Sequence, residues 1–147
     1  MNLDELYQTI ILDHYREKHH AGLREPYKAE VHHLNPSCGD ELTLRVDIDG
    51  ETVRDISYDA EGCSISQASV SVMTDLLIGH SVEHGLDLHD QFVELMHSQG
   101  RVEPDEDVFE DAIAFAGVSK FPARVKCALL GWAAFRDATY QATTKEQ

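Results

Sequence analysis

Apolar side chains near the start of the chain recur with the period of a helix. They stand three and four residues apart, at Leu3, Leu6, Tyr7, Ile10, Ile11 and Tyr15, and His14 falls on the same face. This spacing gathers them on one face, so it predicts an amphipathic helix over residues 3–18. His19-His20-Ala21-Gly22 then ends the helix, and Pro26 indicates a loop.

The next segment alternates with the period of a strand. Polar residues separate Leu42, Leu44, Val46 and Ile48, which is typical of a half-buried strand. Asp49-Gly50 is a strong hairpin signal, and the strand expected to return carries Ile56, Tyr58 and Ala60. A shorter strand is expected over residues 31–34, before the turn-rich segment 35–40. Together these strands predict a small antiparallel sheet.

Helical periodicity resumes after Gly62. We expect a helix that Ser64 or Ser66 caps and that carries Ile65, Ala68, Val72, Met73 and Leu76. The later elements expected are a polar stretch to about residue 86, a short helix with Leu88, Phe92, Leu95 and Met96 that ends at Gly100, a helix from the acidic segment 103–111 to Ala116, and a last helix from Pro122. Strands and helices are segregated along the chain. The sequence therefore predicts an α+β fold, in which helices pack on a small three-stranded antiparallel sheet.

Composition narrows the class of protein. With 147 residues, 42% apolar and 27% charged, the chain has the balance of one globular domain, expected over residues 1–147. The net charge of −15 repels phosphate groups, so neither nucleic acid nor a membrane surface is the expected partner. The first residues lack the pattern of a signal peptide, and the cytoplasm is the expected location.

Three cysteines carry the candidate chemistry. Cys38 lies in a turn, Cys63 lies between a strand and a helix, and Cys127 lies in the first turns of the last helix. In Cys38-Gly39-Asp40 the glycine lets a thiol and a carboxylate reach one ion. Three thiolates and Asp40 make four ligands, which suits tetrahedral zinc, and their wide spacing differs from that of a zinc finger. The alternative is that the cysteines are small buried hydrophobes.

Two further groups of side chains have competing interpretations. Arg124 and Lys126 flank Cys127 and would form a cationic rim around a thiol site, unless one helix face is merely basic. The nine histidines are expected on the surface. The members of the adjacent pairs His19-His20 and His32-His33 are expected to point apart.

Three segments of the chain resemble the signature segments of the U-type iron–sulfur assembly proteins, in the same order. They are Asn35-Pro36-Ser37-Cys38-Gly39-Asp40, Glu61-Gly62-Cys63-Ser64-Ile65-Ser66 and Lys120-Phe121-Pro122-Ala123-Arg124-Val125-Lys126-Cys127-Ala128. The IscU scaffold branch has a histidine immediately before its last cysteine, where this chain has Lys126. The stretch between Cys63 and Cys127 also looks longer than in that branch. Both features are similar to the SufU branch.

The resemblance implies a zinc-dependent sulfurtransferase that works with a SufS-type cysteine desulfurase. It implies zinc ligands at Cys38, Asp40, Cys63 and Cys127, with Cys38 also accepting persulfide sulfur for a downstream iron–sulfur scaffold. Arg124 would help engage the desulfurase, and Lys126 would help to steady the persulfide. One alternative is a scaffold on which the same residues hold iron or a [2Fe–2S] cluster. Another is a structural zinc domain that only binds partners.

Overall fold

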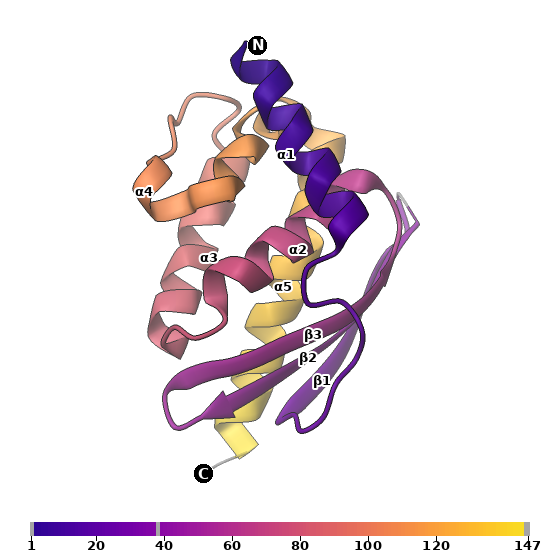
Figure 1. Ribbon diagram of the computed structural model, residues 1–147, viewed down its shortest axis with the longest axis vertical. Coiled ribbons are helices and arrows are strands. Elements are labelled where there is room, and N and C mark those ends of the chain that lie inside the picture. Colours follow the sequence, from indigo (N-terminus) through magenta and orange to yellow (C-terminus); the bar gives the residue numbers. More distant parts are fainter. Residues whose placement is uncertain (1, 38, 146–147) are drawn as a thin grey trace.

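The computed structural model describes residues 2–37 and 39–145. Its elements succeed one another as the sequence predicts, with one helix, then strands, then helices (Figure 1). In order they are α1 (Leu3–Glu17), β1 (Ala29–Asn35), β2 (Asp40–Asp49), β3 (Thr52–Glu61), α2 (Ser64–Leu77), α3 (Val82–Met96), α4 (Glu106–Phe109), the 3-10 helices η1 (Glu110–Ala116) and η2 (Val118–Lys120), and α5 (Pro122–Lys145). The expected α+β fold is confirmed.

The strands form one antiparallel sheet in the order β1-β2-β3. A tight turn at Gly50, with φ +63°, joins β2 to β3, as the Asp49-Gly50 pair predicts. At the other end of β2, Asp40 pairs with Asn35 across the turn that follows β1. Alternation along β2 points Leu44 and Val46 into the core, where both are fully buried. The sheet thus places Asp40 at the end where β3 finishes and the chain continues into α2.

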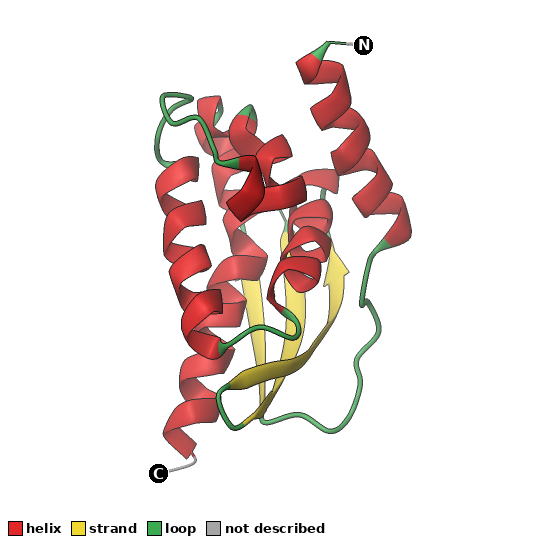
Figure 2. Ribbon diagram, turned by 60° about the vertical axis from the view of Figure 1, so that its left-hand side comes forward, coloured by secondary structure: helices red, strands yellow, loops and turns green. Residues whose placement is uncertain are grey.

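Helices cover one face of the sheet (Figure 2). α5 runs across β1 and β2, α2 packs beside it, and α1 lies on α2. At the centre the Trp132 indole stacks on Phe92, with ring centroids 4.6 Å apart. Trp132 Nε1 donates to Ser69 Oγ at 3.2 Å, and Ser69 donates in turn to the Ala128 carbonyl at 2.7 Å. This core joins α2, α3 and α5.

Two helix starts differ from the sequence prediction. Cys63, not Ser64 or Ser66, caps α2, and its side chain accepts from the Ser66 N–H. α3 begins at Val82, several residues earlier than expected, because Ser81 caps it. Gly85 lies inside this helix. A Cβ there would stand 2.9 Å from the Phe135 ring, so glycine permits close packing of α3 on α5.

The acidic segment does not form one continuous α-helix. Glu110 follows the short α4 with φ +47° and ψ −124°, a backbone conformation outside the helical regions, which interrupts an α-helix. The chain then continues as the 3-10 helix η1. Among the residues described here, none of the helices is long and apolar enough to span a membrane.

Candidate metal centre

Three of the four predicted metal-binding side chains meet at one end of the sheet. Asp40 begins β2, Cys63 immediately precedes α2, and Cys127 lies in the second turn of α5. Their candidate ligand atoms all lie within 4.8 Å of one another. Cys38 lies outside the described residues, two positions before Asp40 in the chain. Folding therefore gathers residues that are far apart in the sequence.

Asp40 is fixed at the centre of this group. It is fully buried, and its Oδ1 accepts the Cys63 N–H at 2.9 Å. Its Oδ2 lies 3.6 Å from Cys63 Sγ. Gly62 makes this approach possible, because its φ of +147° and its missing Cβ leave room for the carboxylate. A Cβ there would overlap Asp40 Oδ1 and stand 2.8 Å from Cγ.

The two described thiols differ in exposure. Cys63 is exposed, and its Sγ accepts the Ser66 N–H at 3.5 Å at the start of α2. Cys127 is buried, and its thiol lies 3.8 Å from the Ala123 carbonyl. One cysteine of the group is thus open to solvent, while the other lies in the protein interior.

Two thiols and a buried carboxylate are a donor set that fits a metal ion. Thiolate and carboxylate ligands are both found at tetrahedral zinc, and thiolates also hold iron–sulfur clusters. The described donors leave one position of a tetrahedron, which Cys38 would complete. The exposure of Cys63 gives a partner access to this centre.

The two predicted cationic residues lie on the surface beside the centre. Arg124 and Lys126 are both exposed near the start of α5. The Arg124 guanidinium lies 5.8 Å from the centre of the Phe121 ring. Arg124 also lines a groove of about 500 Å³ between α1 and the start of α2, which Ser64, the neighbour of Cys63, lines too. The geometry puts Arg124 within reach of a molecule seated in that groove.

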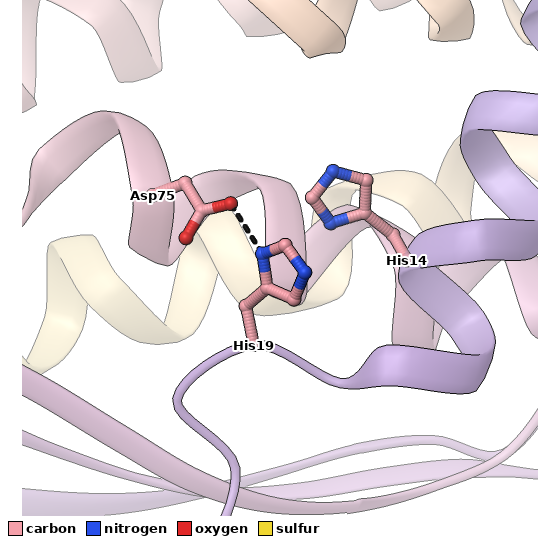
Figure 3. A group of neighbouring side chains, drawn as sticks. All are labelled: His14, His19 and Asp75. Atoms are coloured by element: carbon pink, nitrogen blue, oxygen red, sulfur yellow. Dashed lines mark hydrogen bonds and ion pairs between the residues drawn. The ribbon is translucent and has the colours of Figure 1, made fainter.

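The expectation of surface histidines is wrong for His14 and His89, which are 3% and 8% exposed. His14 and His19 lie with Asp75 in a second group of potential ligands (Figure 3). His19 and His20 do not point apart either, since both contact Asp75, at 2.5 and 3.3 Å. The sequence gives no sign of this group, because Asp75 is more than fifty residues away from both histidines along the chain.

Comparison with known proteins identifies the family. The NifU-like N terminal domain family matches residues 6–128, which is most of the chain. The chain belongs to this family. The resemblance to the U-type iron–sulfur assembly proteins is thereby confirmed, and the three signature segments carry it.

Relatives of this NifU-like chain carry two different names. It is 42% identical over 134 residues to the zinc-dependent sulfurtransferase SufU of Bacillus subtilis, covering 90% of this chain and 88% of that protein. It is 41% identical over 136 residues to the iron–sulfur cluster assembly scaffold protein IscU of Streptococcus pyogenes, covering 92% and 84%.

A crystal structure of a putative scaffold protein for the SUF system from Fervidobacterium islandicum is also similar. It superposes with a TM-score of 0.82 at 34% identity, over 93% of this chain and 98% of that one. The NifU-like chain is therefore an iron–sulfur cluster assembly protein by family, and its place within the family depends on the chemistry of the centre.

Proposed function

We propose that this protein is a zinc-dependent sulfurtransferase of the SufU type. It accepts persulfide sulfur from a SufS-type cysteine desulfurase in the cytoplasm and passes it to a downstream iron–sulfur scaffold. The observation that carries the proposal is the convergence of Asp40, Cys63 and Cys127 within 4.8 Å. The name of the Bacillus subtilis relative supports it independently.

Cys38, Asp40, Cys63 and Cys127 are the residues that would hold the zinc ion. The chemistry that bound zinc supplies is the ionisation of its thiol ligands at neutral pH. A carboxylate is a harder ligand than a thiolate, so a site with Asp40 releases one ligand more readily than a site with four sulfurs. The Cys63 N–H holds the Asp40 carboxylate in place, so this side chain would be preset to bind the ion.

Cys38 is the sulfur acceptor in this proposal. Its thiolate attacks the terminal sulfur of the persulfide on the desulfurase, and a new S–S bond forms at Cys38. The S–S bond of the donor breaks, and its electron pair leaves with the desulfurase thiolate. The exchange therefore needs no external oxidant or reductant. Arg124 and Lys126 supply positive charge at the mouth of the site, which favours an anionic persulfide.

The experiment mixes the zinc-loaded, iron-free protein with a SufS-type desulfurase, cysteine and a thiol reductant, and measures alanine release over many turnovers. The reductant removes sulfur from Cys38 so that turnover continues. We expect strong stimulation that Cys38→Ala abolishes. Ser37→Ala, a change in the same turn, serves as the matched control and keeps the stimulation. Full stimulation by Cys38→Ala would overturn the proposal.

The second candidate function is that of a scaffold, because the Streptococcus pyogenes relative, which is 41% identical, is named a scaffold protein. In that case the same residues would hold a nascent [2Fe–2S] cluster. Alanine release would then be unchanged, while iron and sulfide would build a coloured cluster on the chain. Lys126 favours the sulfurtransferase, because it stands where the scaffold branch has a histidine.

A structural zinc domain that only binds partners is distinguished by the same experiment. It would neither stimulate the desulfurase nor build a cluster. Zinc removal would unfold it, and mass spectrometry would find no added sulfur on Cys38.

A further inference from the structure

A second group of potential ligand atoms lies far from the candidate metal centre of Asp40, Cys63 and Cys127. His14 projects from α1, His19 lies in the loop that follows α1, and Asp75 lies near the end of α2, and the three side chains converge (Figure 3). Their ligand atoms all lie within 4.8 Å of one another. Asp75 stands twelve residues along α2 from Cys63, which is about 18 Å at 1.5 Å per residue. The two groups are therefore separate sites.

The contacts of His19 require an additional positive charge. Its Nδ1 lies 2.5 Å from Asp75 Oδ2, and its Nε2 lies 2.6 Å from Glu17 Oε2. A neutral imidazole carries a single N–H, so it satisfies one of these carboxylates and turns a lone pair toward the other. Either a second proton or a metal ion must stand between His19 and one carboxylate.

The arrangement around both histidines is the one that metal ligands show. A metal-bound histidine usually places its other ring nitrogen on a carboxylate or a carbonyl, which orients the ring. His14 Nε2 lies 2.9 Å from Asp111 Oδ2, and His19 Nε2 has the Glu17 contact. In both rings Nδ1 is then the atom left for an ion. His14 Nδ1 meets Ser71 Oγ at 2.8 Å, and this hydroxyl also accepts the His19 N–H at 2.9 Å. An ion would replace only the contact to His14, and the hydroxyl would keep its bond to His19.

We propose that His14, His19 and Asp75 form a second site for a divalent metal of the zinc, nickel or cobalt class. Two imidazoles and a carboxylate suit these ions. The fourth position is open to water or to His20, whose Nε2 lies 3.3 Å from Asp75 Oδ1. The site fastens the end of α1 to α2, and it is independent of the proposed sulfur transfer.

The site needs a small adjustment to close on a metal. Ligands about 2.0 Å from a tetrahedral zinc lie about 3.3 Å apart. The contact between His19 and Asp75 must therefore open by roughly 0.8 Å. Both side chains have freedom to do so, because they are 32% and 38% exposed and His19 lies in a loop. His14 is buried and remains the fixed point.

The test counts metal ions in the full-length protein. We would strip the chain of metal under reducing conditions and titrate it with Co²⁺ at pH 8. The alkaline pH matters because hydrogen bonds to Glu17 and Asp75 raise the pKa of His19, so protons compete with the metal. Cobalt bound by cysteine shows sulfur-to-metal charge-transfer absorption, whereas cobalt bound by histidine and carboxylate lacks it. The two sites are therefore counted separately.

We expect two Co²⁺ ions per chain, one with and one without charge-transfer absorption. His19→Ala and Asp75→Asn should each lose the second ion and keep the first. His32→Ala is the matched control, since His32 also faces a carboxylate, Glu41, at 3.6 Å but lies outside the trio. At a hundredfold excess over Kd, zinc at the second site should raise Tm by roughly 5–10 °C.

Two results would overturn the proposal. One is a wild-type chain that binds no cobalt beyond the cysteine-bound ion. The other is a second ion that His19→Ala and Asp75→Asn both retain. Should His19→Ala fail to fold, Asp75→Asn decides alone. Imidazole NMR supplies an independent check, because zinc must shift the His14 and His19 ring nitrogens. Rings that respond to pH and not to zinc would mean that a proton fills the site.

Discussion

Gly62→Ala displaces the Asp40 carboxylate without altering any candidate ligand. The added Cβ would overlap Asp40 Oδ1 and stand 3.0 Å from its Cα, so either the carboxylate or the backbone must move. Displacement of the carboxylate breaks its hydrogen bond from the Cys63 N–H. A hydrogen bond to a charged group contributes about 1.5–3 kcal/mol. An alanine at this positive φ adds strain of about 1–3 kcal/mol.

The sum predicts a loss of about 2.5–6 kcal/mol in the free energy of unfolding of the metal-free, reduced protein. Gly50→Ala is the matched control. Gly50 also has a positive φ, of +63°, yet a Cβ there meets nothing within 4 Å. It should cost about 1–2 kcal/mol from backbone strain alone. Urea unfolding of both variants measures the difference, which isolates the displacement of Asp40.

Zinc retention gives a second measurement on the same pair. Supporting residues around a metal typically change its affinity 10–100-fold. We expect at least that loss in Gly62→Ala and none in Gly50→Ala, measured by competition with a chelator. The reasoning is refuted if Gly62→Ala is no less stable than Gly50→Ala and holds zinc as tightly as the wild type does.

Other contacts give shorter predictions. Ser69→Ala leaves the buried Trp132 N–H without its acceptor and should cost about 1–3 kcal/mol, seen as a lower urea midpoint; an unchanged midpoint would contradict that role. Burial raises the pKa of Tyr58 to about 12, so an ultraviolet titration should show a tyrosine that ionises there and that Tyr58→Phe removes. A hydrogen bond to His33 lowers the pKa of Asp137 below 3.8, so the stability it contributes is lost as pH falls through that lower value. His33→Ala should raise the Asp137 midpoint in a carboxyl NMR titration; because Asp137 is half exposed, stability should change by only tenths of a kcal/mol.

The sequence predicts those parts of the fold that depend on local patterns. Alternation at Leu44 and Val46, the Asp49-Gly50 turn and the helical spacing in α1 each depend on residues close together in the chain. Their strands and helices appear where expected. One error is in the acidic segment, where Glu110 interrupts the expected helix. The others are at two helix starts, where one hydrogen bond decides. A thiol caps α2, and Ser81 begins a helix in a stretch whose glycine suggests a break.

The two ligand groups differ in how far the sequence reveals them. Cysteines and an aspartate are recognisable as metal ligands from the sequence alone. The resemblance to the family then implies that Cys38, Asp40, Cys63 and Cys127 bind the same ion. His14 and Asp75 carry no such signal. They lie on separate helices, and only the packing of α1 on α2 brings them together. Contacts between distant segments do not follow from periodicity.

Asp40, Cys63 and Cys127 come from the start of β2, the start of α2 and the start of α5. During synthesis, a ribosome has made most of the protein before it adds the last of these side chains. An incomplete or unfolded chain offers isolated thiols at the ends of long flexible loops, and closing those loops costs entropy. Metal should therefore bind the finished fold far better than the nascent chain. Metal binding would then raise the free energy of unfolding, and weak binding to the unfolded chain would reduce this gain only slightly.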